Sequence, residues 1–305
     1  MASVFEDIKV IGEYEQPEQI AAKLEQMKDP DVIGSVSDDT YGERGVKALP
    51  DWLNLFQDQP WMYATYRFGY IALRKSSSAQ PQPIQDAGAI APDLSLKNSR
   101  INIRLDRFHV EKYPGGGTHD ILVTFAARNQ VAENQESLSF SQTYRVRERQ
   151  SAGIAGYPIF IGLHVGSQGV AFECSTVNVK NEEDKTILSA LESSPFQSGL
   201  KLLTTAQPAI APFTEISLGV VKLLAQRYEN VPVQKFYLGL DFDQAALGVS
   251  LTEGNYIAVQ VPNETAINWS EWVYKPDMGA IVKQGDNSAT LPYNYVIFRI
   301  SKYEE

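Results

Sequence analysis

The chain has 305 residues, of which 43% are hydrophobic and 21% are charged, so it can bury one large core or two ordinary ones without disulfide or metal support. No apolar run reaches the ~20 residues that a membrane-spanning helix needs. A formal net charge of −10 argues against broad binding to nucleic acid or to an anionic membrane, because both require clustered positive charge. The lone Cys174 cannot form an internal disulfide, and the N-terminus lacks the basic and apolar regions of a secretory signal. These features predict a soluble, cytoplasmic protein.

Residues 1–75 are expected to form a small N-terminal α+β block. Pro17 stands where a helix would start, and Ile20, Leu24 and Met27 follow it at helical spacing. This spacing predicts one short amphipathic helix.

A second, shorter helix is predicted within residues 49–60, and the alternating aromatic run at residues 61–74 predicts a strand. Residues 76–99 follow, with three prolines, many small polar side chains and no usable periodicity. Such a composition is typical of a linker or a long surface loop.

From residue 100 onward, short segments rich in β-branched and aromatic residues are separated by glycine-bearing turns, the pattern of an antiparallel sandwich. The segments are residues 100–110, 119–128, 138–147, 157–165, 170–179, 234–243, 255–262 and 293–301. The predicted fold class is mainly β, or α+β overall. An antiparallel β-sandwich-like main domain is expected over residues 100–262, with a short helix in 182–194 and a capping helix near 214–230. Residues 263–305 are expected to form a C-terminal aromatic β segment.

Residues 107–120, RFHVEKYPGGGTHD, contain two of the three histidines and raise the question of a metal site. In a hairpin, burial of the apolar side chains on both arms fixes the register, because a slip of one residue would turn Ile121, Val123 and Phe125 away from Phe108 and Val110. This register sends His109 and His119 to opposite faces, which argues against a zinc or iron site. It also places Glu111 opposite Asp120, where a hard cation such as calcium could bind or both carboxylates could turn into solvent.

Residues 159–174 suggest a second hairpin, in which Cys174 lies on the apolar face and His164 on the other. Side chains alternate between the faces of a strand, so these two residues cannot form a nucleophile–base pair. Cys174 is therefore expected to be a small buried hydrophobic residue.

Two further carboxylates, Asp241 and Asp243, lie two residues apart and should share the outward face of a strand. Such a pair can bind a divalent cation, but a solvated strand end is the more ordinary explanation. The candidate cation ligands are therefore Asp241, Asp243, Glu111 and Asp120, and a divalent cation is the one cofactor considered.

Arginines alternate in the stretch YRVRERQ, so Arg145, Arg147 and Arg149 would lie on one face of a strand. They form either a solvated strand face or a stripe that contacts an anion or an acidic partner.

Aromatic residues cluster near the C-terminus, where Trp269, Trp272 and Tyr274 occur in a segment with weak strand periodicity. Exposed aromatic side chains anchor protein interfaces or stack on sugars, and buried ones form a core. Trp269, Trp272 and Tyr274 are therefore interface candidates together with the three arginines.

The sequence lacks the usual glycine-rich phosphate motifs and the metalloprotease and serine-hydrolase signatures, and no catalytic group of residues is predicted. The leading hypothesis is a non-enzymatic binding or assembly subunit that acts through protein–protein contacts, with a protein partner or further copies of itself. The alternative is a β-sandwich enzyme or a cation-dependent ligand-binding protein that uses surface carboxylates. A third hypothesis is a β-rich toxin or membrane-acting effector, because amphipathic strands can also face lipid.

Overall fold

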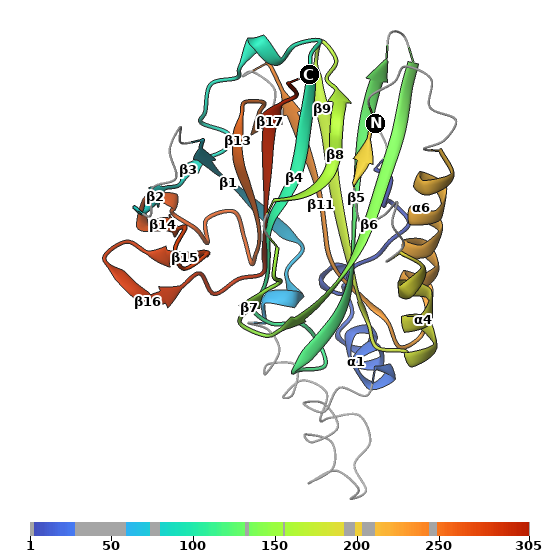
Figure 1. Ribbon diagram of the computed structural model, residues 1–305. Coiled ribbons are helices and arrows are strands. Elements are labelled where there is room, and N and C mark those ends of the chain that lie inside the picture. The colour runs from blue at the N-terminus through green and yellow to red at the C-terminus, as the bar shows by residue number, and fades with distance from the viewer. Residues whose placement is uncertain are drawn as a thin grey trace, which may run out of the picture.

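The computed structural model describes residues 3–27, 59–73, 80–131, 134–154, 156–191, 199–202, 211–243 and 249–304. Within these ranges the chain forms three β-sheets and three α-helices (Figure 1), which confirms the predicted mainly β, sandwich-like fold. The helix predicted in residues 49–60 falls almost wholly outside the described ranges. None of the helices that are described combines the length and the apolar character needed to cross a membrane.

The larger sheet has eight strands, in the order β10, β8, β4, β17, β13, β1 and β3, with β7 paired to β4. The second sheet has five strands, in the order β12, β11, β9, β5 and β6. The strands of the eight-stranded sheet are β1 Thr65–Ala72, β3 Gln85–Asp86, β4 Arg100–Val110, β7 Gln150–Ser151, β8 Tyr157–His164, β10 Leu200–Lys201, β13 Gly254–Val261 and β17 Tyr295–Lys302. Those of the five-stranded sheet are β5 Thr118–Val131, β6 Asn134–Arg147, β9 Gly169–Val179, β11 Val231–Asp241 and β12 Val249–Ser250.

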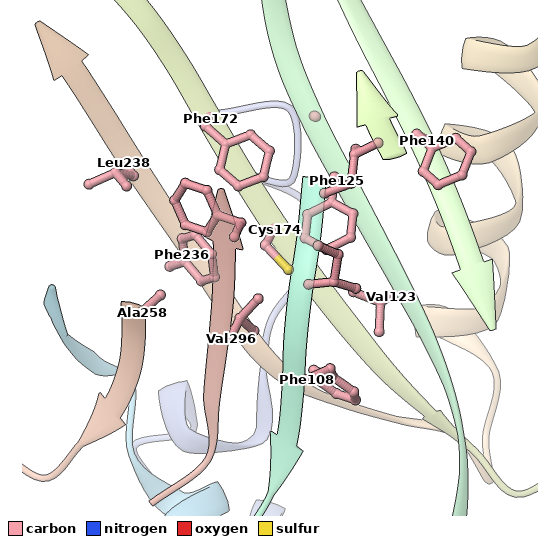
Figure 2. Close-up of a cluster of buried hydrophobic side chains, with 14 of the residues drawn as sticks. Phe108, Val123, Phe125, Phe140, Phe172, Cys174, Phe236, Leu238, Ala258 and Val296 are labelled. Atoms are coloured by element: carbon pink, nitrogen blue, oxygen red, sulfur yellow. The ribbon is translucent and has the colours of Figure 1, made fainter. Parts of the chain in front are cut away.

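The main core lies between these two sheets. Figure 2 shows Phe108 of β4 and Val296 of β17 pointing toward Phe125, Phe172 and other side chains of the facing sheet. The rings of Phe125 and Phe172 stack with centroids 5.6 Å apart. Aromatic rings of this size contribute most of the area that a sandwich core removes from water.

A third, four-stranded sheet packs on the outer face of the eight-stranded sheet and forms a second core there (Figure 1). Its strands, in the order β16, β15, β14 and β2, are β16 Asp286–Thr290, β15 Ala280–Lys283, β14 Trp272–Lys275 and β2 Gln82–Pro83. The buried side chains of this second core are Ile71, Ile84, Ile257, Val259, Val261, Ile267, Trp269, Ile281, Leu291, Tyr295 and Ile297. Strands β14 to β16 were not predicted individually, because β16 exposes most of its side chains and shows no apolar alternation.

Helices cover the outer face of the five-stranded sheet (Figure 1). The helices are α1 Pro17–Gln26, α4 Glu182–Ala190 and α6 Ala211–Gln226, and the short 3-10 helices are η1 Ile11–Glu13, η2 Pro60–Met62, η3 Leu94–Leu96 and η4 Trp269–Glu271. On α6, the apolar side chains of Ile216 and Leu223 are exposed. The buried side of α6 instead presents Ser217, Val221 and Leu224 to the sheet.

The N-terminal segment also lies against the five-stranded sheet. Ser3 Oγ donates a hydrogen bond to the buried carboxylate of Glu173, and Val4 N donates to the same oxygen at 3.0 Å. Lys235 Nζ donates to the carbonyl oxygen of Ile8 at 2.7 Å. Because helices and this N-terminal segment cover the outer face of the five-stranded sheet, β9 is buried on both of its faces. A sequence pattern that alternates between a buried and an exposed face would not predict such a strand.

The two predicted hairpins were wrong, because each pair of arms belongs to two different sheets. Strands β4 and β8 are neighbours in the eight-stranded sheet, whereas β5 and β9 are neighbours in the five-stranded sheet. Sheets in a sandwich lie ~10 Å apart, and the residues between β8 and β9 can span that gap when extended. Both glycine-bearing turns therefore cross the sandwich instead of closing a hairpin.

Strands from both ends of the chain complete the eight-stranded sheet. β1 pairs with β13, and β17 pairs with both β13 and β4. The segment predicted as a connection, residues 76–99, is described from residue 80, where it supplies β2 to the small sheet and β3 to the large one. The predicted division into 1–75, 76–99, 100–262 and 263–305 stays a prediction.

Candidate functional site

A β-bulge in β4 places three charged side chains on the outer face of the eight-stranded sheet. In the pairing with β17, Phe298 lies opposite Leu105 and Ile297 lies opposite Arg107, so Asp106 is the extra residue. Leu105 and Phe108 both point into the core between the two main sheets although they are three positions apart, which the alternation of a regular strand would not allow. The bulge accounts for this and turns Asp106 and Arg107 to the same side as Arg104.

Arg299 of β17 completes the group. It lies directly opposite Arg104, and its Nε and Nη2 atoms donate hydrogen bonds to Asp106 Oδ2 at 3.0 Å and 2.5 Å. Its Nε also lies 3.1 Å from Asn255 Oδ1. A charge-assisted pair of this kind is stronger than a neutral hydrogen bond, and here it fixes the head group of Arg299.

Arg107 reaches from the large sheet to the small one. Gly279, in the turn between β14 and β15, lies so close that a Cβ atom there would be 2.2 Å from Arg107 Nη2. The guanidinium group of Arg107 therefore rests on the backbone of this turn. Only a glycine allows this approach without displacing the arginine.

These side chains line a recess of about 360 Å³ at the junction of the two sheets, here called the arginine recess. Its lining residues are Arg104, Asp106, Arg107, Ile154, Gly156, Tyr274 and Arg299. Among the described residues, Asp106 Oδ1 and Arg107 Nε are buried polar atoms with no hydrogen-bond partner. Buried polar atoms are normally satisfied, and these two exceptions belong to side chains that line the recess.

The predicted meeting of Glu111 and Asp120 across a hairpin was wrong, because the hairpin does not form. Each carboxylate instead faces one of the predicted arginines. Arg149 Nε lies 3.6 Å from Glu111 Oε1, and Arg145 Nε lies 3.8 Å from Asp120 Oδ1. Lys185 Nζ, 3.3 Å from Asp120 Oδ2, is a further cation partner. The two carboxylates are thus neutralised by protein cations.

Asp241 and Asp243 lie at the other end of the five-stranded sheet from Asp120. Asp241 pairs with Gly169 at the start of β9, and Asp120 pairs with Val179 at its end, ten positions away, or about 33 Å at ~3.3 Å per residue. Desolvation raises the pKa of Asp241, and the charge of Asp243 raises it further although the backbone N–H of Asp243 lowers it. Across the described ranges, no three His, Cys, Asp or Glu side chains converge as a metal site would require.

The three histidines and Cys174 do not form a catalytic group. Cys174 is buried between the sheets, where desolvation raises the pKa of its thiol well above the ordinary value. His164 lies on the outer face of the eight-stranded sheet, and burial together with the charge of Arg100 lowers its pKa. His109 stacks on Tyr295 with ring centroids 4.5 Å apart, and His119 is fully buried beside Asn178.

The predicted interface arginines lie at one edge of the five-stranded sheet. Arg145 and Arg147 are exposed on β6, and Arg149 follows in a turn. The side chains of Arg145 and Arg149 are 77% and 86% exposed. At that exposure their ion pairs contribute little to stability.

The predicted aromatic residues separate into two environments. Trp269 is part of the second core, whereas Trp272 and Tyr274 of β14 are partly exposed and pack against its edge. Tyr274 also lines the arginine recess. Of the three predicted aromatic residues, Tyr274 alone lines the arginine recess.

Sequence reasoning missed Arg104, Asp106, Arg107 and Arg299. The available signal was the three-residue spacing of Leu105 and Phe108, which is inconsistent with strict alternation and indicates a bulge. The pairing of β4 with β17 brings together residues almost two hundred positions apart, and no local pattern reveals it. No family model, curated protein or solved structure matches this chain.

Proposed function

We propose that this chain is a non-enzymatic binding subunit that holds an acidic protein partner on the face around the arginine recess. The observation that carries the proposal is the recess itself, where Arg104, Arg107 and Arg299 converge beside Tyr274. Tyrosine, tryptophan and arginine are the residue types that contribute most to binding at protein interfaces. Trp272, on the same side of β14 as Tyr274, extends this surface.

The charge of the recess favours an acidic partner. Three arginines and one aspartate line it, which gives a local charge of +2 in a chain whose net charge is −10. Arginine stays protonated in proteins, so these groups can hold an anion but cannot relay a proton. This chemistry supports recognition and not acid–base catalysis.

A separate partner fits this face better than a second copy. In a two-fold symmetric dimer, the same surface patch lies on both sides of the interface, so one recess of charge +2 would lie against another. We place this function in the cytoplasm, because the free thiol of Cys174 agrees with a reducing compartment.

Site-specific photocrosslinking tests the proposal. A benzoylphenylalanine at position 274 should capture one protein of discrete mass, and the same probe at Tyr237 should not. Tyr237 is a matched control because it is 47% exposed on the other main sheet. The captured protein, once identified and purified, should bind the wild-type chain and bind Trp272→Ala at least about tenfold more weakly, as for an interface hot spot.

Two results would overturn this proposal. One is equal capture at positions 274 and 237, which would mean that the probe reacts without a specific contact. The other is a discrete oligomer of the purified chain, seen by light scattering, that dissociates on Trp272→Ala or Tyr274→Ala. That result would assign this face to copies of the chain itself.

A further inference from the structure

We infer that the arginine recess binds a phosphate monoester group in its dianionic form. The inference rests on the proposed function, since it specifies the chemistry that the same face recognises. It is carried by the charge, the unpaired polar atoms and the size of the recess.

The charge of the recess matches a dianion. Asp106 already neutralises Arg299 through two hydrogen bonds, which leaves Arg104 and Arg107 without a carboxylate in the recess. A phosphate monoester carries about −1.5 to −2 charges at neutral pH and three acceptor oxygens. A carboxylate would neutralise only one of the two remaining arginines.

The arrangement of the arginines favours a bound anion. Arg104 and Arg299 are direct cross-strand partners, so their Cβ atoms lie about 4.5–5.5 Å apart. Like charges in such a pair are unfavourable unless a counterion lies between them. Asp106 supplies one negative charge to this pair, and a phosphate held by Arg104 and Arg107 would supply the second. Guanidinium groups bind phosphate through paired, parallel hydrogen bonds.

The recess side chains also carry two polar atoms that have no hydrogen-bond partner among the described residues, Arg107 Nε and Asp106 Oδ1. Both atoms are buried, so a ligand reaches them only when the side chain shifts toward it. The guanidinium of Arg107 is the end of a flexible side chain that lies next to Gly279, and a bound phosphate that drew it outward would give Nε an acceptor.

The volume sets the size of the group. At about 360 Å³, the recess is at the lower end of the ~300–1,000 Å³ range of small-molecule sites. It accommodates a phosphate and the first part of its ester group, with Tyr274 and Ile154 as its less polar walls. The phosphate could come from a phosphorylated side chain of the partner or from a free sugar phosphate.

Calorimetric titration of the full chain separates these sources. The probes are a phosphoserine peptide, its unphosphorylated form, its glutamate form and glycerol 3-phosphate. We expect the phosphopeptide to bind at least about tenfold more tightly than the glutamate peptide, and the difference to shrink below pH ~6 as the phosphate takes up a proton. Equal binding of glycerol 3-phosphate would identify a free phosphate as the ligand, and markedly weaker binding would identify a phosphorylated partner.

Variants assign the binding to the recess. Arg104→Gln and Arg107→Gln should each weaken binding of the phosphate probe roughly tenfold or more, as loss of a charged hydrogen bond does. Arg104→Lys keeps the charge and should cause an intermediate loss of affinity, because lysine lacks the planar guanidinium group that donates two parallel hydrogen bonds. The double variant Arg145→Gln, Arg147→Gln removes two exposed arginines elsewhere and should bind like the wild type. Circular dichroism confirms that each variant is folded.

The inference fails if neither phosphate probe binds more tightly than the glutamate peptide, or if Arg104→Gln and Arg107→Gln leave binding unchanged. Its failure is separable from that of the proposed function. A partner captured at position 274 whose binding survives phosphatase treatment would overturn the phosphate inference alone. Phosphate binding at the recess with no protein captured at position 274 would overturn the protein-partner proposal alone.

Discussion

Arg104 of β4 and Arg299 of β17 lie directly opposite each other on neighbouring antiparallel strands, near the middle of the largest sheet. Two like charges in this position repel, and a sheet would ordinarily avoid them. The bulged residue Asp106 lies beside the pair and binds Arg299. The irregularity in β4 and the charge pair are thus one structural feature.

Replacing Asp106 by asparagine should destabilise the fold, because the shape is kept and the charge that offsets Arg299 is lost. The Asp106 side chain is 12% exposed, so water has little room to take the place of the carboxylate as the partner of Arg299. We expect a loss of about 1–3 kcal/mol in the free energy of unfolding, measured in urea. Asp277→Asn, at an exposed position in the turn between β14 and β15, should change stability little. Added phosphate should stabilise Asp106→Asn more than the wild type, and the opposite order would contradict this account.

Gly279→Ala should move Arg107 out of position. Two effects contribute: the backbone φ of +59° is unfavourable for alanine, and the new methyl group would meet Arg107 Nη2 at 2.2 Å. Gly285→Ala is a matched control, since its φ is +85° and nothing lies near the added atom. Both variants should cost about 1 kcal/mol in thermal unfolding, because the Arg107 guanidinium ends a flexible side chain and can move aside. Gly279→Ala should in addition weaken binding of the phosphate probe, and equal binding by the two variants would contradict the contact between Arg107 and the turn.

Asn294 should be among the most sensitive polar positions in the protein. Its fully buried amide accepts from the backbone N–H groups of Glu111 and Lys112 and donates to Lys112 O and Gln260 Oε1, at 2.9–3.1 Å. Asn294→Ala leaves these groups unpaired, and we expect a loss of about 3 kcal/mol or more in urea unfolding. Asn263→Ala, at an exposed turn, should cost less than about 1 kcal/mol. If Asn294→Ala lowered the free energy of unfolding only slightly, water molecules would be making the hydrogen bonds that the amide makes in the wild type.

Alkaline pH should unfold the protein through its buried tyrosines. Burial raises the pKa of Tyr66, Tyr113, Tyr144, Tyr256 and Tyr295 above the ordinary value. The unfolded chain therefore loses these protons first, near pH ~10, so the stabilisation is complete below that pH and is lost as pH rises through the folded-state values. The urea midpoint should fall steeply above pH ~10, and tyrosinate absorbance should rise over the same pH range. Tyr113→Phe should make this fall shallower, and an unchanged slope would contradict the assignment.

The individual strands were predictable from the sequence because alternation is a local property. The segment at residues 100–110 coincides with β4, and the one at 170–179 differs from β9 by one residue. Pairing was not predictable in the same way, since consecutive strands cross between sheets here. The predicted pairing of Glu111 with Asp120 required β4 and β5 to be neighbours in one sheet. It was wrong because these consecutive strands belong to different sheets.

The candidate site was largely hidden from sequence analysis. Tyr274 was identified by residue type alone, whereas Arg104 and Arg107 were read as ordinary strand residues. Their shared face depends on the bulge at Asp106, and their partner Arg299 comes from the far end of the chain. A prediction would have required both the bulge and the long-range pairing.

The position of β17 has a consequence for biosynthesis. This strand, Tyr295–Lys302, is inserted between β4 and β13, so the eight-stranded sheet stays divided until it arrives. During translation, β4 would wait with an open edge while almost two hundred further residues are made, which takes about 10–40 s at ~5–20 residues per second. An open strand edge is a template for aggregation, so nascent chains of this protein should depend on chaperones until β17 leaves the ribosome.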